Sequence, residues 1–226
     1  MHYSNIQRAT FLRRPNRFIA HIEVDGREEV CHVKNTGRCR ELLTDRATIY
    51  VEHHDNPKRK TKYSLIAVEK GDLLINMDSQ APNKVVGEWL LEKEPFGKVQ
   101  MLKPECTYGS SRFDFYLETE AEKIFIEVKG VTLEEDGIVR FPDAPTERGI
   151  KHLEELCACV EAGYKAAVIF VVQMEGMQHF EPNEKTHPQF GEALRQARKA
   201  GVEVLAYECK VTPSSLEITK SIPVML

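Results

Sequence analysis

Long apolar runs are missing from this sequence. The longest, residues 166–172, is far too short to cross a bilayer. The first residues, MHYSNIQRATFLRR, contain no apolar segment of the kind found in secretory signals. From these absences we expect a cytoplasmic protein that does not associate with membranes.

Cysteine pairs of the metal-binding type are missing as well. The six cysteines are scattered and none belongs to a C-x₂-C motif, which argues against a structural zinc site. Cys157 and Cys159 lie two residues apart on an expected helix, where they cannot face each other. We therefore expect free and mostly buried thiols in a reducing compartment.

The net charge of −4 is unevenly distributed. Residues 1–62 contain 13 Lys and Arg against 8 Asp and Glu, whereas the remaining residues contain 18 against 27. A basic N-terminal third beside an acidic remainder suggests a nucleic-acid-facing module joined to a metal-binding one. A chance fluctuation over a short segment is the alternative explanation.

The first 80 residues contain five short segments with strand character, separated by turn signals such as Asp25-Gly26 and Lys70-Gly71-Asp72. These segments are FIAHIEV, EEVCHVK, ATIYVEHH, KYSLIAVEK and DLLINM. Together they predict an N-terminal OB-like β-barrel over residues 1–80.

A barrel of this type binds nucleic acid in a charged groove that carries stacking platforms. Its candidate contacts are the basic side chains Arg13, Arg14, Arg17, Lys34, Arg38 and Arg40. The run Lys58-Arg59-Lys60 is a further candidate, although a solvated loop is the simpler explanation for it.

Two runs of alternating apolar residues, SRFDFYL and KIFIEVKGV, predict a pair of half-buried strands. The short polar link 119–122 predicts an antiparallel hairpin in which Glu118 pairs with Lys123. In this register Asp114 lies directly opposite Glu127, with Cβ atoms about 5 Å apart on the same face. Lys129, two residues after Glu127, belongs to that face too.

Two carboxylates this close repel each other unless a cation lies between them. Mg²⁺ prefers carboxylate and water oxygens in an octahedron at about 2.1 Å, so Asp114 and Glu127 are candidate ligands. Lys129 would position or activate an attacking water, or stabilise charge on a phosphate. The alternative is a surface hairpin whose acids are satisfied by neighbouring Lys and Arg.

A helix is predicted to start at Pro82-Asn83 and to end before Pro95 and Gly97, with an apolar stripe that includes the only tryptophan, Trp89. Glu88 lies to one side of this stripe. It is a candidate further ligand for the metal or a water if the helix leans over the hairpin, and otherwise a plain exposed glutamate.

After the hairpin, GIVRF is a third strand candidate, and Thr146 is a good N-cap for a helix that closes at Gly163. Arg148 and Lys151 lie at the positive end of this helix, which suits a phosphate. For His152 a structural hydrogen bond is the favoured role. A buried strand KAAVIFVVQ, a helix HPQFGEALRQARKAG and a last strand VEVLAYECKV follow.

The order of helix, three antiparallel strands, helix, strand, helix and strand, with D…E-x-K in the hairpin, resembles the restriction-endonuclease-like PD-(D/E)XK fold. Over its whole length the chain resembles the sugar fermentation stimulation protein A family. Five segments carry the resemblance: CHVKNTGRCREL, APNKVVGEWL, SRFDFYL, EVKGVTL and FPDAPTERGIKHLEEL. Phe113 stands where the motif name has proline.

This resemblance implies an α/β (α+β) protein with the OB-like domain followed by a nuclease-like αβββαβ domain over residues 81–226. It gives Asp114, Glu127 and Lys129 the catalytic positions, and Val128 a backbone carbonyl for the metal, Mg²⁺ or Mn²⁺. It also implies sequence-nonspecific DNA binding and a link to the regulation of maltose and sugar metabolism.

Two functions remain open at this point. The first is a metal-dependent nuclease, since opposed carboxylates without a metal would repel a phosphate. The second is a catalytically silent DNA-binding regulator on a nuclease scaffold, because a fold does not settle a function. A sugar-binding regulator is a weaker third idea, since the single tryptophan lies in an apolar stripe.

Overall fold

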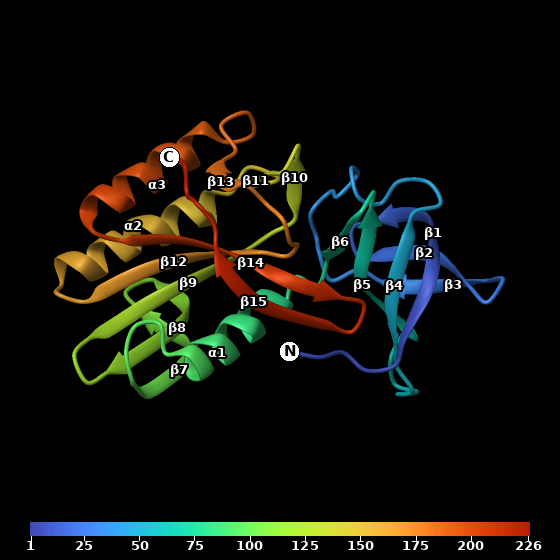
Figure 1. Cartoon of the computed structure of the whole chain (residues 1–226), viewed down its shortest axis with the longest axis horizontal. Coiled ribbons are helices and arrows are strands. Elements are labelled where there is room, and N and C mark those ends of the chain that lie inside the picture. Colours follow the sequence, from blue (N-terminus) through green and yellow to red (C-terminus); the bar gives the residue numbers. More distant parts are fainter.

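The computed structural model describes residues 1–226, and Figure 1 shows an all-β N-terminal part beside a larger part with helices. The N-terminal strands are β1 (Ile6–Asn16), β2 (Ile19–Val24), β3 (Arg27–His32), β4 (Thr48–His53), β5 (Tyr63–Lys70) and β6 (Leu73–Asn76). Strands β1 to β5 pair in a ring, because β1 pairs with β2 and β4, β5 pairs with β4, and β3 closes onto β5. This ring is the OB-like barrel that the sequence predicts.

All five strands predicted in this part are present, but β1 was missed. Only Ala9 and Phe11 of β1 are buried, and most of its other side chains are polar or charged. With two buried positions in eleven residues, the strand has almost no apolar alternation to detect.

The C-terminal part is built on a six-stranded mixed sheet in the order β15-β14-β12-β9-β8-β7. These strands are β7 (Val99–Tyr108), β8 (Ser111–Thr119), β9 (Lys123–Val131), β12 (Lys165–Val172), β14 (Glu203–Thr212) and β15 (Ser215–Ser221). The central strands β9, β12 and β14 run parallel, and the outer strands are antiparallel to their neighbours.

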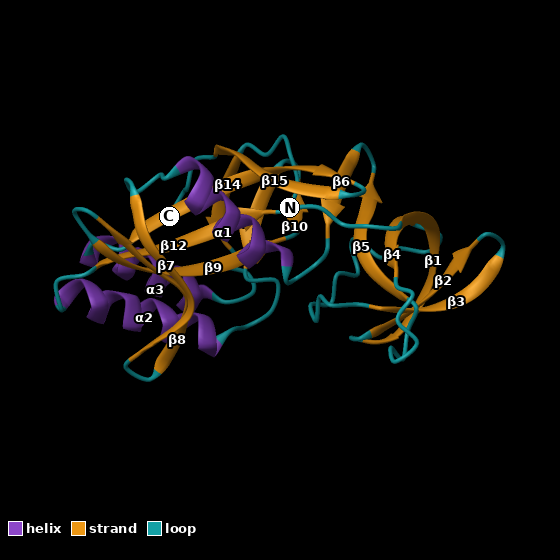
Figure 2. Ribbon diagram, turned by 90° about the horizontal axis from the view of Figure 1, so that it is seen from below, coloured by secondary structure: helices purple, strands orange, loops and turns teal.

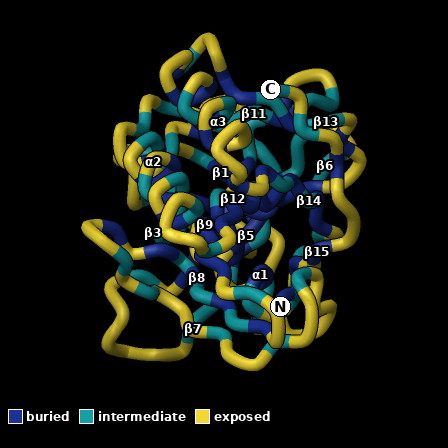
Figure 3. Tube along the Cα trace, turned by 90° about the vertical axis from the view of Figure 1, so that its left-hand side faces the viewer, coloured by how far each residue is buried: buried dark blue, intermediate teal, exposed yellow.

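Helices cover both faces of this sheet, with α1 (Ala81–Lys93) on one face and α2 (Glu147–Glu161) and α3 (Pro188–Ala200) on the other (Figure 2). Residues 166–172 of β12 are all buried, because alternate side chains pack toward opposite helical layers. Burial is greatest along these central strands and falls toward the loops (Figure 3). The sequence prediction of a strand buried on both faces is confirmed.

The predicted helices are also confirmed. Thr146 caps α2 by accepting a 3.0 Å hydrogen bond from the Gly149 amide. Gly201 closes α3 with a φ of 102°, a conformation that glycine adopts without strain. No helix in the chain combines the length and the apolar character that crossing a membrane would require.

The predicted strand order needs correction at two points. Residues 138–141, expected as the third antiparallel strand, form β11 (Ile138–Phe141) in a separate small sheet with β10 (Leu133–Glu135) and β13 (His179–Pro182). The third antiparallel strand is β7, an edge strand with no buried residue and therefore no apolar alternation. Strand β15 also follows β14, which the sequence reading took as the last strand.

The two parts pack against each other. The Asn76 amide at the end of β6 donates a 2.9 Å hydrogen bond to the Gln173 carbonyl, and Gln173 Nε2 donates back to Asn76. Lys70 of the barrel forms a 2.5 Å ion pair with Glu134 of the small sheet. One apolar cluster includes buried residues from both parts, so the two parts share a continuous core.

Candidate active site

The β8–β9 hairpin has the predicted register up to the site. Glu118 pairs with Lys123, and the ladder continues to the pair Phe115–Ile126, where it ends, so the predicted direct pairing of Asp114 with Glu127 is not formed. One residue further along, a side chain takes the place of the backbone pairing. The Oδ2 of Asp114 accepts a 2.8 Å hydrogen bond from the Val128 amide. Asp114 is thus joined to the residue that follows Glu127.

A second element holds Asp114 in place. Asn83, in the first turn of α1, donates from its Nδ2 to Asp114 Oδ1 at 2.7 Å. Sequence reading did not select Asn83, although it lies within the APNKVVGEWL segment at the start of the helix that covers this hairpin. Its amide is the kind of group that could be expected to orient a carboxylate.

Glu127 is buried, and its two carboxylate oxygens have different surroundings. Oε1 accepts a 2.6 Å hydrogen bond from Lys129 Nζ and is hydrogen-bonded to Nδ1 of His152. Oε2 is also buried but has no hydrogen-bond partner. A polar atom left unpaired in the interior costs about 1–3 kcal/mol, and more if charged, so this oxygen is suited to a ligand that the protein itself does not supply.

The two carboxylates are also different electrostatically. Burial raises the pKa of Asp114, and the nearby negative charge of Glu127 raises it further. Burial alone would raise the pKa of Glu127 too, but the hydrogen bonds from His152 and Lys129 bring it below the ordinary value. The site therefore holds one ionised carboxylate beside another that retains its proton more readily.

Neighbouring segments of the same protein pack closely against the end of β9. A Cβ placed on Gly130, directly after Lys129, would lie 2.6 Å from Gln173 Oε1 and 2.8 Å from Pro82 Cγ. Only glycine allows this approach. The start of α1, which carries Asn83, is thereby packed against the strand that carries Glu127 and Lys129.

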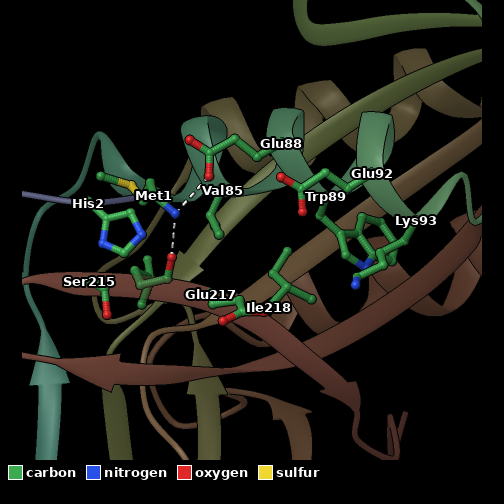
Figure 4. A pocket seen from close by; sticks show the side chains of 11 residues that line it. Met1, His2, Val85, Glu88, Trp89, Glu92, Lys93, Ser215, Glu217 and Ile218 are labelled. Atoms are coloured by element: carbon green, nitrogen blue, oxygen red, sulfur yellow. Dashed lines mark hydrogen bonds and ion pairs between the residues drawn. The ribbon is translucent and has the colours of Figure 1, made fainter.

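Glu88, predicted as a further ligand, lies in different surroundings. Its carboxylate forms a 2.7 Å ion pair with the Met1 amine, which also donates to the Leu216 carbonyl (Figure 4). These groups line a cavity of about 400 Å³ between α1 and β15. The contacts of Glu88 give no support to its predicted role, because none of them involves Asp114, Glu127 or Lys129.

No cluster of three or more His, Cys, Asp or Glu side chains is arranged to hold a metal ion. The residues that the sequence nominates for the metal are two carboxylates, Asp114 and Glu127, and the peptide carbonyl of Val128. A set of this size suits Mg²⁺, which is usually bound by one or two carboxylates and keeps several waters.

Three of the basic residues predicted to contact nucleic acid are engaged within the barrel. Arg14 donates to four backbone carbonyls, those of Arg17, Asn35, Gly37 and Arg38. Lys34 forms a 2.6 Å ion pair with the buried Asp78. Arg13 pairs with Glu28 at 2.5 Å. Their first role is to hold the barrel and its loops.

The other three arginines predicted as contacts, Arg17, Arg38 and Arg40, are exposed and form no ion pair. They line a hollow of about 230 Å³ whose two loops are joined by the Arg14 guanidinium. Gly37 of this hollow packs so closely against the Asp143 carboxylate that a Cβ there would collide with it. The basic hollow therefore borders the C-terminal part.

A small cleft of about 120 Å³ lies beside this contact. Asn35 and Asp143 line it together with Gly130, which follows Lys129. The exposed arginines and the end of β9 thus border the same region of the molecule.

The two basic residues of α2 differ. Arg148 Nε donates a 3.3 Å hydrogen bond to His152 Nε2, so its guanidinium is linked to the buried site. Lys151 Nζ is half-exposed and donates to the Ser110 carbonyl at 3.4 Å. His152 has the structural hydrogen bond that the sequence favours, and its partner is Glu127.

Comparison with known proteins shows the family to which the chain belongs. Two family models match: the SfsA N-terminal OB domain over residues 12–77, and the sugar fermentation stimulation protein RE domain over residues 80–215. Sugar fermentation stimulation protein homologues from Clostridium beijerinckii and Desulfitobacterium hafniense are each 58% identical over 226 residues, covering 100% of this chain and 100% and 99% of theirs. The structure of Pyrococcus furiosus SfsA in complex with Ca²⁺ is 27% identical, with a TM-score of 0.87, and the match covers 100% of this chain and 98% of that one.

Proposed function

The chain belongs to the sugar fermentation stimulation protein family, and on this premise we propose that it is a metal-dependent phosphodiesterase that acts on nucleic acid, with DNA as the substrate. The observation that carries the proposal is the buried Glu127 Oε2, which has no hydrogen-bond partner in the neighbourhood of a second carboxylate, Asp114. In this role Asp114, Glu127 and Lys129 act as the trio of a PD-(D/E)XK site.

The residues present fit Mg²⁺ or Mn²⁺. Asp114 and Glu127 would hold the ion through their carboxylates, with the Val128 carbonyl as a third oxygen donor. When bound, the ion would supply charge stabilisation at the phosphate and a lowered pKa for a bound water. The solved Pyrococcus furiosus protein is a complex with Ca²⁺, another hard cation that takes oxygen ligands, which supports divalent-metal binding by this chain.

The chain's own side chains have distinct tasks in the proposal. Asn83 and the Val128 amide orient Asp114, and His152 and Lys129 hold Glu127 in its ionised form. Lys129 Nζ lies next to the carboxylate, where its charge can orient an attacking water or stabilise the phosphate. The Glu88 carboxylate has no task in this scheme.

Nucleic acid would be held mainly by the barrel. Arg17, Arg38 and Arg40 are exposed and without ion pairs, so they are available to phosphates. Lys151 would add a contact from α2. Arg13, Arg14 and Lys34 would contribute through the loops that they hold, because their charged groups already have partners.

The test is Mg²⁺-dependent or Mn²⁺-dependent cleavage of duplex and single-stranded DNA by the full chain, compared with Asp114→Ala. We expect cleavage by the wild type, none by the variant, and DNA affinity that is largely unchanged, because the variant keeps the barrel arginines. RNA substrates tested in parallel decide the class of nucleic acid. Absence of wild-type cleavage on every substrate with either metal would reject the phosphodiesterase.

A second candidate, a catalytically silent DNA-binding regulator with a role in sugar metabolism, is favoured by one observation. The exposed arginines of the barrel need no chemistry at the other domain in order to bind phosphates. Under this alternative the wild type binds DNA with a steep salt dependence but never cleaves it, and Asp114→Ala behaves as the wild type does.

A further inference from the structure

His152 and Arg148 connect the surface of α2 to Glu127. His152 is 5% exposed, and its ring is hydrogen-bonded on both sides, through Nδ1 to Glu127 Oε1 and through Nε2 to Arg148 Nε. Both residues belong to the FPDAPTERGIKHLEEL segment, from which the proposed function uses His152 to keep Glu127 ionised but gives Arg148 no task at the metal site.

The partners determine where the imidazole proton lies. Arg148 Nε–H can only donate, so His152 Nε2 must accept. An ionised Glu127 carboxylate can only accept, so His152 Nδ1 must donate. One tautomer alone, with its proton on Nδ1, satisfies both contacts.

The N–H donor of His152, together with Lys129, determines which oxygen of Glu127 accepts hydrogen bonds. Both hydrogen bonds end on Oε1, and Oε2 is left without a partner. A different tautomer would turn the unprotonated Nδ1 toward a carboxylate, where the two acceptors repel each other. This repulsion would favour rotation of the Glu127 carboxylate away from its present orientation.

We propose that His152 is a positioning residue for the metal site and that Arg148 acts through it by fixing its tautomer. The proposal rests on the proposed metal site at Glu127. It gives Arg148 a task besides contact with nucleic acid. Hydrogen-bonding partners behind metal ligands typically account for 10–100-fold in metal affinity.

The experiment is a Mn²⁺ titration of the full chain without nucleic acid, followed by electron paramagnetic resonance of the free ion. His152→Ala is expected to bind Mn²⁺ about 10–100-fold more weakly than the wild type. His152→Asn should recover most of the affinity, because its side-chain N–H can take the place of Nδ1–H. His187→Ala is the control for loss of a buried histidine, since His187 contacts Thr146 and Glu147 rather than Glu127.

Arg148→Ala keeps the proposal testable if His152→Ala fails to fold, because Arg148 is exposed. Loss of a positive charge by itself would tighten the binding of a cation. The positioning role predicts the opposite, weaker Mn²⁺ binding, whereas the control Lys151→Ala should bind as tightly as the wild type or more tightly.

The outcomes separate the two proposals. Wild-type binding with unchanged affinity in His152→Ala or in Arg148→Ala would overturn the positioning role and leave the proposed metal site standing. Failure of the wild type to bind Mn²⁺ would remove the metal site itself, and the positioning role with it.

Discussion

In the barrel, Arg17, Arg38 and Arg40 are exposed and have no ion pair, whereas in the C-terminal domain Asp114 and Glu127 are enclosed by hydrogen bonds. The exposed charges are suited to a flexible, extended polyanion, for which approximate placement is sufficient. The enclosed charges are held at fixed positions, as chemistry at a single bond requires. In the proposed function, DNA binding therefore belongs mainly to the barrel and catalysis to the C-terminal domain, and each assignment can be tested separately.

The largest expected effect concerns Lys129. Lys129→Ala should lower the rate of DNA cleavage by about 10²–10³-fold, because it removes a charge from the site where negative charge develops. DNA affinity should change little, since the barrel is intact. Lys123→Ala, an exposed lysine at the other end of β9, is the matched control. Equal rates for the two variants in single-turnover cleavage would mean that Lys129 has no part in the chemistry.

A comparison of Arg14 with Arg17 distinguishes an arginine that holds the barrel together from one that is free to contact DNA. Arg14→Ala should lower the free energy of unfolding by about 3 kcal/mol, because four carbonyls lose their charged donor. Arg17→Ala should leave urea denaturation nearly unchanged, since no other group of the protein depends on its side chain. Similar midpoints for both variants would contradict the division of roles among the barrel arginines.

Removal of the three exposed arginines that line the hollow sharpens the binding side of the comparison. Each phosphate contact on duplex DNA contributes about −0.9 to the slope of log K against log salt concentration. Replacement of Arg17, Arg38 and Arg40 by alanine should therefore reduce the slope by about 3. Replacement of Arg198 and Lys199 on α3 is the control, and an equal change there would indicate a diffuse charge effect.

The smallest effect concerns the junction of the domains. Burial alone would raise the pKa of Glu134, but the hydrogen bonds from Lys70 and the Gly137 amide lower it below 4.5. The stabilisation by the ionised carboxylate is thus complete above pH 4.5 and is lost as the pH falls through the lower folded-state value. Glu134→Gln should be less stable than the wild type at pH 7, and the difference should shrink near pH 3. A constant difference in urea denaturation would exclude this linkage.

Sequence patterns were informative where a segment was buried on one face or on both. The hairpin register followed from the alternation in SRFDFYL and KIFIEVKGV, and the buried strand β12 followed from its continuous apolar run. Strands β1 and β7 were missed because an edge or highly exposed strand leaves no such alternation.

The site shows the same limit. The trio Asp114, Glu127 and Lys129 was proposed from the sequence because strand register relates residues that are close along a ladder, and its catalytic role stays a prediction. Asn83 lies on α1, not on the β8–β9 hairpin, so strand register could not point to it. Glu88, on the same helix, was proposed as a ligand because it is acidic, but it pairs with the Met1 amine. Which face of a helix meets a strand depends on packing such as the close approach at Gly130, which no local pattern encodes.

A crystal structure of the full chain soaked in Mn²⁺ tests the central claim most directly. The account predicts anomalous density for one ion that is bound by Glu127 Oε2 and an Asp114 oxygen. Clear density for both side chains with no ion between them, at a concentration of Mn²⁺ that supports nucleases, would contradict it.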